Sequence, residues 1–504
     1  MAVNGKQHIH LIGIGGSGLS AIALVLLESG YIVSGSDRQL SPLAERVQAA
    51  GGRIMIGHRP ENVLGADLVV RSSAIPEDNV EVQAALAAGL PVLKRADFLG
   101  QLMAGHTGIA VAGSHGKTTT TAMLAWTLSA LACDPSFIIG GVSANLGSNA
   151  HAGRGPFFVI EADEYDRMFL GLRPRIAVVT NVEHDHPDCY PTPEDFYQAF
   201  VEFTDRLAPG GALLACTDDA GAARLLEQAA GRGHHTFAYG LGDQGKAIGE
   251  MGNSSSAYQA IDLSLNDRGG FTFDAICNRQ SIPGNRQLET NIPHSLISNP
   301  VPTVALQVPG EHNVRNALAA LAVVDLLGLP IEEAARALGS YRGTGRRFEV
   351  RGEAAQITVI DDYAHHPTEI RATLAAARAR YGNRRIWAVW QPHTYSRTRT
   401  FLADFTAAFG DADRLLVTEI YPARENAPTD GFSGRQVALS IKNPPALYAP
   451  DLAQARDTLL EQLRPGDVVL VLSAGDADLL SGQVIERLKQ RNGEDSQNRI
   501  GEYD

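Results

Sequence analysis

The sequence predicts an α/β protein of three domains, and three observations lead to that prediction. The chain has 504 residues, of which 44% are hydrophobic, enough for several separate cores. Short apolar runs typical of strands alternate with helical stretches, as in parallel βαβ units. The alternation starts afresh at about residue 109, with a strand before the glycine loop at 113–116, and again after 343–345. We therefore expect Rossmann-like first and third domains at 1–106 and 345–490, and a central α/β domain at 107–344.

The first domain opens with a strand, a helix and a second strand. The expected strands are 8–14, 31–35, 67–71 and 91–94, and the expected helices are 19–28 and 80–88.

The second domain repeats this opening around its own glycine loop. We expect strands at 109–112, 157–160, 176–180, 258–265 and 271–276, and helices at 118–131 and 313–327. Two of these strands, 157–160 and 176–180, are followed at once by polar or charged residues, as at the carboxyl edge of a parallel sheet, where ligands gather. The stretch 240–302 is rich in Gly, Asn, Ser and Gln, which predicts a surface insertion near 277–302.

A hinge is expected at Gly343-Thr344-Gly345, before the third domain. The expected strands beyond it are 357–360, 386–390, 414–418 and 467–472, with helical stretches between them. The last residues, 491–504, are polar, and we expect a disordered tail.

Composition narrows the function class. The formal charge of −13 and the pI near 5.6 argue against a broad surface for nucleic acid or anionic membrane. The four cysteines are widely spaced, without a CxxC pair, which fits a reducing cytoplasm. The longest apolar runs fall far short of a membrane span, and the first residues do not resemble an export signal. We expect a cytoplasmic protein without nucleic-acid or membrane partners.

The strongest single motif is the glycine loop of the second domain. It consists of Gly113, Ser114, His115, Gly116, Lys117 and Thr118, between an expected strand and an expected helix. Backbone N–H groups and a helix N-terminus hold polyphosphate in such loops, while the lysine contacts the terminal phosphates and the threonine hydroxyl binds Mg²⁺. The central domain is therefore predicted to be of the P-loop ATPase type, although Val111 stands where the usual first glycine would be.

A second glycine loop, Gly13 to Gly18, follows the first expected strand in the pattern GxGxxG. Asp37 stands near the end of the next strand, where dinucleotide-binding domains carry a ribose-binding acid. By itself the pattern is compatible with a diphosphate, with an NAD site, or with a plain glycine turn.

Glu161 and His186 each follow an expected strand of the second domain. A carboxylate at this edge can hold Mg²⁺ beside the phosphates. Imidazole is an uncommon Mg²⁺ ligand, so on the residues alone His186 is as well explained by a hydrogen bond.

Four later motifs can also be interpreted from their residues. Residues 310–316 are typical of a capped helix start. The clusters of Arg, His and Asp at 345–348, 361–367 and 391–397 suit charged substrates.

Taken in order, the motifs are specific. They are GIGGSG, GSHGKTTT, EADEYD, NVEHDH, GEHNVRN, GTGRRFE, DDYAHHPTE and QPHTYSRT. This set resembles the Mur ligase family from about residue 8 to 473, and most closely its members that add alanine. The resemblance implies an ADP-forming ligase of peptidoglycan precursor synthesis. Its substrates would be UDP-N-acetylmuramate, L-alanine and ATP, its metal Mg²⁺, with Mn²⁺ able to substitute, and its state a monomer or homodimer.

The resemblance also assigns roles by position. The UDP diphosphate would lie near Gly15, Gly16, Ser17, Gly18, Asp37, Ser72 and Ser73. ATP would contact Gly113, Ser114, His115, Gly116, Lys117, Thr118, Thr119, His312, Asn313, Asn316, Arg347 and Asp362. The metal ligands would be Thr118, Glu161 and His186, and Tyr363, His365 and Arg397 would line the alanine side. The residues expected to carry catalysis are Lys117, Glu161, His186, Arg347, His365 and Arg397.

Two departures bear on this assignment. Some members have Arg where this chain has Thr394, which puts one contact to the alanine carboxylate in question. Members that add later amino acids carry a modified lysine soon after the DH motif, yet residues 182–206 contain no lysine, which favours the alanine-adding step. A tripeptide-recycling ligase of the same family, an NAD-dependent oxidoreductase and a nucleotide sensor without catalysis are the alternatives. The preference among L-alanine, L-serine and glycine stays open.

Overall fold

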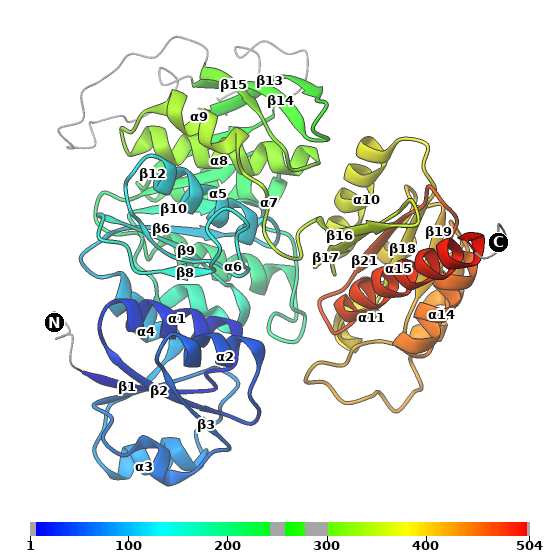
Figure 1. Ribbon diagram of the computed structural model, residues 1–504. Coiled ribbons are helices and arrows are strands. Elements are labelled where there is room, and N and C mark those ends of the chain that lie inside the picture. Colours follow the sequence, from blue (N-terminus) through cyan, green and yellow to red (C-terminus); the bar gives the residue numbers. More distant parts are fainter. Residues whose placement is uncertain (1–6, 242–257, 278–300, 501–504) are drawn as a thin grey trace.

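The computed structural model describes residues 7–241, 258–277 and 301–500, with the backbone alone for 301–302 and 491–500. Figure 1 shows three α/β parts, each built on one sheet: the first domain below the second, and the third beside them. The expected three-domain α/β class is confirmed. Among the described residues, no helix combines the length and the apolar character that a membrane crossing needs.

The first domain is a five-stranded parallel sheet in the order β3-β2-β1-β4-β5. Its strands are β1 (His8–Ile12), β2 (Ile32–Asp37), β3 (Arg53–Ile56), β4 (Leu68–Arg71) and β5 (Val92–Lys94). Its helices are α1 (Ser17–Glu28), α2 (Pro42–Ala49), η1 (Pro60–Val63), α3 (Val80–Ala87) and α4 (Arg95–Met103). The strand order reverses between β1 and β4, so the loop after β1 opens at the position where such sheets bind ligands.

The second domain has a ten-stranded sheet in the order β15-β14-β13-β12-β11-β10-β6-β9-β7-β8. Its strands are β6 (Thr107–Ala112), β7 (Ser136–Ile138), β8 (Ala150–His151), β9 (Phe157–Glu161), β10 (Ile176–Val179), β11 (Ala212–Cys216), β12 (His235–Gly240), β13 (Tyr258–Leu265), β14 (Phe271–Cys277) and β15 (Val301–Ala305). Its helices are α5 (Lys117–Ala130), η2 (Tyr165–Gly171), α6 (Pro193–Thr204), α7 (Ala220–Gly231), α8 (Glu311–Leu326) and α9 (Ile331–Gly339). The strands from β13 to β7 are parallel, and the chain switches sides of the sheet beside β6.

The third domain has a six-stranded sheet in the order β16-β17-β21-β18-β19-β20, parallel except for β16. Its strands are β16 (Glu349–Ala354), β17 (Ile357–Asp362), β18 (Ile386–Trp390), β19 (Arg414–Val417), β20 (Ala446–Tyr448) and β21 (Val468–Leu472). Its helices are α10 (Pro367–Tyr381), α11 (Tyr395–Thr400), α12 (Leu402–Thr406), α13 (Gly434–Ser440), α14 (Leu452–Gln462) and α15 (Asp478–Ile500).

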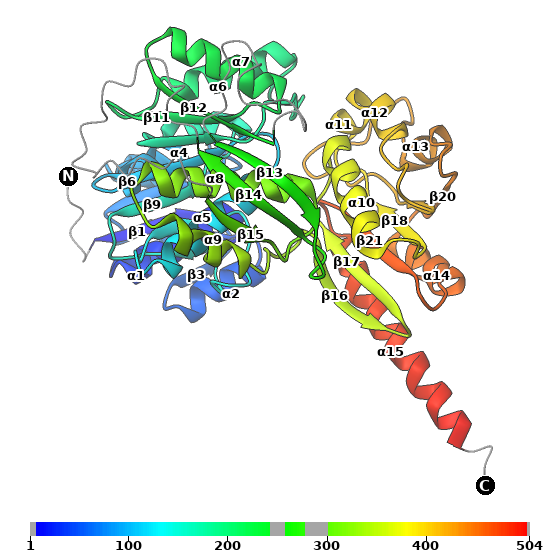
Figure 2. The same ribbon diagram turned by 90° about the horizontal axis from the view of Figure 1, so that it is seen from above.

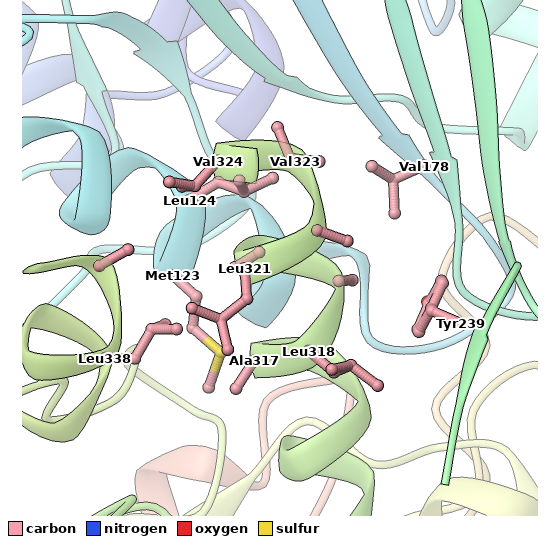
Figure 3. Packing of buried hydrophobic residues seen from close by; sticks show 14 of the residues in the cluster. Met123, Leu124, Val178, Tyr239, Ala317, Leu318, Leu321, Val323, Val324 and Leu338 are labelled. Carbon is pink, nitrogen blue, oxygen red and sulfur yellow. The ribbon is translucent and has the colours of Figure 1, made fainter. Parts of the chain in front are cut away.

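The core of the second domain holds the phosphate loop in place. Helices α5, α8 and α9 pack against one another and against the sheet, with Met123, Leu124, Leu318, Leu321 and Leu338 interdigitated (Figure 3). These side chains are 0–1% exposed. Because α5 begins directly at Lys117, burial of its apolar residues fixes the loop at its N-terminus relative to the sheet edge.

The expected elements are present, each within a few residues of its expected ends. The elements not predicted from the sequence include α2, β3 and α4 in the first domain and β7, β8, β11, β12, β15, α6, α7 and α9 in the second. β3 is half exposed and has no clear alternation. The expected disordered tail is wrong for 491–500, where the backbone continues α15 without a break, as Figure 2 shows. Most of the expected insertion, 278–300, lies outside the described residues.

The link between the second and third domains is held at its ends. The N–H of Ala144 donates to the carbonyl of Gly343 (3.0 Å), and that of Gly345 donates to the carbonyl of Val142 (2.9 Å). Between them, Thr344 is buried, with its hydroxyl 2.6 Å from that of Tyr341. If the third domain rotates about this link, residues 343–345 would therefore stay attached to the second domain.

Candidate active site

The phosphate loop joins β6 to α5 in a conformation that favours glycine. Gly113 has φ +135° and Gly116 has φ +80°. A Cβ on Gly113 would lie 2.0 Å from Oγ1 of Thr180, and one on Gly116 would lie 2.8 Å from Oδ1 of Asn316. Larger residues would therefore be strained and would also crowd the strand β10 and helix α8.

Lys117 folds back over the loop. Its Nζ donates to the carbonyls of Gly113 (2.5 Å) and Ser114 (3.0 Å) and to Oε1 of Glu164 (2.9 Å). Burial lowers the pKa of Lys117, but the carboxylates of Glu164, Asp163 and Glu161 together outweigh burial and hold the pKa above its usual value. An ammonium has three donors, and all three are engaged here, so a phosphate that bound Lys117 would have to displace at least one of these acceptors.

Two of the three expected metal ligands are in direct contact. The hydroxyl of Thr118 donates to Oε1 of Glu161 (2.9 Å), whose other oxygen accepts from the N–H of Gly140 (2.6 Å). Burial raises the pKa of Glu161 despite the positive charges of Lys117 and Arg347. A buried carboxylate beside a hydroxyl offers hard oxygen donors and would be stabilised by a further cation, so this pair fits Mg²⁺.

The third expected ligand, His186, faces other partners. Its Nε2 lies 3.5 Å from Oε1 of Glu164, and its Nδ1 lies 3.2 Å from Nη2 of Arg397. Burial lowers the pKa of His186, but Asp185 and Glu164 raise it above its usual value. In the described structure His186 is therefore a hydrogen-bonding residue that lines the same cavity as Thr118 and Glu161.

Arg397 ties the third domain to the second. It is 3% exposed, and its Nε donates to Oδ1 of Asp185 (2.8 Å) across the domain interface. Its Nη1 lies 3.0 Å from Nδ1 of His393. Together with the contact to His186, three of the five guanidinium N–H groups are engaged, which leaves two for a substrate carboxylate.

A cavity of about 300 Å³ lies on one side of the phosphate loop, between the second and third domains. Its lining includes the expected nucleotide contacts His115, Gly116, Thr119, His312, Asn313, Asn316, Arg347 and Asp362. Burial lowers the pKa of His312 to about 4, so the ring is neutral, and raises the pKa of Asp362 to about 6. A mostly apolar cavity with a few amide and imidazole groups suits a nucleoside.

A second cavity, of about 360 Å³, lies on the other side of the loop and is lined by all three domains. Ser17 and Gly18 come from the first domain, Ser114, Lys117, Thr118, Glu161 and His186 from the second, and Tyr363, His365 and Arg397 from the third. Arg347 and Glu369 line both cavities. Burial lowers the pKa of His365 to about 3, so its ring is neutral.

The glycine loop of the first domain is braced from within. The N–H of Gly15 donates to Oδ2 of Asp37 (2.8 Å), and the hydroxyl of Ser41 donates to the carbonyl of Gly15 (2.9 Å). Asp37 therefore supports the loop, a role that its spacing alone did not indicate. The other residues expected at the UDP diphosphate lie near one another around β1, β2 and β4, but they do not line the second cavity. They are Gly15, Gly16, Asp37, Ser72 and Ser73.

Thr394, the departure in the third domain, has a structural role. It has φ +61°, and its Oγ1 accepts from the N–H of Arg397 (3.3 Å) at the start of α11. It thus places Arg397 at the cavity although it offers no charge of its own.

Three buried or half-buried charges were not singled out from the sequence. Glu164 pairs with Lys117, Glu369 lies 3.7 Å from Nη1 of Arg347, and Arg95 reaches from the first domain toward Asp163 (3.4 Å). Glu164 and Glu369 belong to the motifs EADEYD and DDYAHHPTE, each of which follows a strand. Their position near the end of a strand was therefore a signal in the sequence. Nothing in the local pattern distinguishes Arg95.

The comparisons with known proteins agree along the whole chain. The model described as Mur ligase family, catalytic domain, matches residues 8–107, the Mur ligase middle domain matches 111–324, and the Mur ligase, glutamate ligase domain, matches 346–475. The chain is 42% identical to the UDP-N-acetylmuramate–L-alanine ligase of Roseiflexus sp., over 96% of this chain and 100% of that protein. It is also 42% identical to the enzyme of the same name from Solidesulfovibrio magneticus, over 94% and 96% of the two chains.

Solved structures give the same result. The UDP-N-acetylmuramate-alanine ligase of Thermotoga maritima superposes with a TM-score of 0.76 at 28% identity, over 96% of this chain and all of that one. A murein peptide ligase from Psychrobacter arcticus reaches 0.66 at 26% identity, over 96% and 99%. The oxidoreductase alternative has no support in these matches. The chain belongs to the Mur ligase family.

Proposed function

We propose that the chain is an ATP-dependent ligase that joins L-alanine to the lactyl carboxylate of UDP-N-acetylmuramate, releasing ADP and phosphate. The observation that carries the proposal is the cavity that all three domains line. It brings the first glycine loop, the phosphate loop and the third-domain residues Tyr363, His365 and Arg397 around one space. The relatives of similar length that carry this activity by name support the choice of substrates.

In the first step, an oxygen of the lactyl carboxylate attacks the γ-phosphorus of ATP, and the bond to the β-phosphate oxygen breaks. The products are an acyl phosphate and ADP. Lys117 at the loop and Arg347, which lines both cavities, supply positive charge where the phosphoryl group passes. Mg²⁺, for which Mn²⁺ can substitute, would be held by Thr118 and Glu161, with His186 at their edge, and would neutralise charge on the phosphates.

In the second step, the alanine amine attacks the acyl carbon, and phosphate leaves with the former carboxylate oxygen. The two free N–H groups of Arg397 would hold the alanine carboxylate. Nδ1 of His365 is 2.9 Å from the carbonyl of Tyr363, so donation there leaves Nε2 to accept a hydrogen bond from the amine. The buried site would also protect the acyl phosphate from water.

We place the reaction in the cytoplasm. The cysteines of the described residues are free thiols, which suits a reducing compartment.

Phosphate release tests the proposal. ATP, UDP-N-acetylmuramate and L-alanine together should release phosphate in step with formation of UDP-N-acetylmuramoyl-L-alanine, and omission of either co-substrate should stop it. Replacing L-alanine in turn by L-serine, glycine and the tripeptide L-alanyl-γ-D-glutamyl-meso-diaminopimelate tests specificity. A higher kcat/KM for the tripeptide would reassign the chain to recycling, for which the murein peptide ligase fold is a precedent. Release that needs no amine would contradict the proposal.

A further inference from the structure

At the first cavity, a cluster of three side chains has no role in the two proposed chemical steps, although one of them, His115, is also an expected nucleotide contact. His115 of the loop, Glu183 after β10 and His366 before α10 each offer one ligand atom, and these atoms all lie within 4.8 Å of one another. Nε2 of His115 is 3.0 Å from Oε2 of Glu183, and Nδ1 of His366 is 3.9 Å from the same oxygen. The two imidazole rings face each other with centroids 4.6 Å apart.

These distances suit a four-coordinate metal ion. Bonds of about 2.0–2.2 Å in a tetrahedron place ligand atoms about 3.4 Å apart. The separations of 3.0 and 3.9 Å lie on either side of that value. The third pair, from His115 to His366, lies within 4.8 Å and would have to close toward that value when a metal binds.

The burial of the His366 side chain with few hydrogen bonds is a second observation that points to a ligand. Its side chain is 2% exposed, and among the described residues its Nε2 has no hydrogen-bond partner. Its Nδ1 accepts only a long contact, 3.4 Å, from the N–H of Thr368. Burying an imidazole with so little hydrogen bonding is costly, and a cation on Nδ1 would replace the long contact to Thr368 with a stronger one, while Nε2 would keep its unpartnered state.

The surroundings favour positive charge at this point. Nδ1 of His115 lies 3.2 Å from Oε1 of Glu369, so two carboxylates flank one ring. Although burial opposes it, Glu369 and Glu183 raise the pKa of His115 to about 9. Burial and the neighbouring His115 lower the pKa of His366 to about 4, so this ring is neutral, the form that binds metals.

We infer that His115, Glu183 and His366 form a site for a divalent transition ion, Zn²⁺ above all, that clasps the third domain onto the second. Two imidazoles, one carboxylate and an open fourth position are a ligand set of zinc sites and a poor one for Mg²⁺. The site is distinct from the Thr118 and Glu161 pair, which lines the other cavity. It does not depend on which amino acid the ligase uses.

The test uses Co²⁺ as a spectroscopic probe and Zn²⁺ as competitor, added to the full chain in excess Mg²⁺. Wild type should bind one Co²⁺ with the intense visible bands of four-coordinate cobalt, and Zn²⁺ should displace it. His366→Asn keeps an acceptor at the start of α10, and Glu183→Gln keeps an acceptor for the hydroxyl of Thr368, which lies 2.7 Å from Oε1. Each should weaken Co²⁺ binding by about 100-fold.

His184→Asn is the matched control, because it removes another partly buried histidine that contacts the third domain through Phe401 but lies outside the cluster. It should retain the cobalt spectrum. Zn²⁺ should also raise the thermal unfolding midpoint of wild type and of His184→Asn, and not that of His366→Asn. The inference would be overturned if wild type bound no four-coordinate Co²⁺. It would also be overturned if His366→Asn and Glu183→Gln, or the one of them that folds, bound Co²⁺ as tightly as wild type. Ligase activity is measured separately, so a failed metal site leaves the proposed reaction standing.

Discussion

The loops Gly13–Gly18 and Gly113–Gly116 both join a buried parallel strand to a helix at a point where the strand order of a sheet reverses. Both begin with a glycine of positive φ. Their surroundings differ. The second-domain loop is packed among buried charges, including Lys117, Glu161 and Glu164. The first-domain loop is braced mainly by Asp37 and Ser41.

A glycine loop specifies a shape that fits phosphate, and we expect the charges that later elements place around it to decide whether the loop only binds or also promotes reaction. Changes at the second-domain loop should therefore affect turnover, and changes at the first-domain loop should affect affinity for the UDP substrate.

Lys117→Met should have the largest effect. Loss of the ammonium leaves Glu164 buried without its main partner and removes charge stabilisation from phosphoryl transfer. We expect turnover to fall by about 10³-fold or more, with affinity for UDP-N-acetylmuramate nearly unchanged. Steady-state phosphate release and titration calorimetry measure the two quantities. A large loss of UDP-substrate affinity would break the distinction between the loops.

Gly113→Ala should lower both stability and turnover, because the added Cβ meets Thr180 at 2.0 Å and φ is +135°. Gly51→Ala is the matched control, with φ +103° and nothing within 4 Å of the added Cβ. Thermal unfolding should show a drop of several degrees for Gly113→Ala beyond that of the control, corresponding to about 1–3 kcal/mol of overpacking. Equal drops would mean that backbone strain alone matters.

Gly15→Ala should act on affinity. Its Cβ would lie 2.8 Å from Oδ2 of Asp37, and the carboxylate would have to move away from the Gly15 N–H. We expect the KM for UDP-N-acetylmuramate to rise about tenfold, close to 1.4 kcal/mol, while kcat and the KM for ATP change little. A kcat loss as large as that of Gly113→Ala would contradict the comparison.

The smallest effect is on pH dependence. His115 has its pKa raised from 6.5 to about 9 in the folded protein, so its pairs with Glu369 and Glu183 contribute stability that is complete below pH 6.5 and is lost as the pH rises through 9. The unfolding midpoint of metal-free wild type should fall by a few degrees between pH 7 and 9, and His115→Gln should flatten that decline. An identical decline in both proteins would rule out His115 as its source.

The sequence predicted the strand, loop and helix around Lys117 because apolar alternation and glycine spacing are local signals. It could not predict the partners of those residues. Asp185 and Arg397 are 212 positions apart, and Lys117 and Glu164 are 47 apart, so only the assembled sheets bring them together. Asp37 illustrates the same limit, since its spacing suggested a ribose contact and the fold uses it to brace Gly15.

Oxygen transfer gives the most direct test of the central claim, that the γ-phosphoryl group passes onto the lactyl carboxylate. UDP-N-acetylmuramate labelled with ¹⁸O in that carboxylate is turned over with ATP and L-alanine, and the phosphate is analysed by mass spectrometry. We predict one ¹⁸O atom in each phosphate released, because the acyl phosphate loses the former carboxylate oxygen. Unlabelled phosphate formed along with the alanine product would contradict the account.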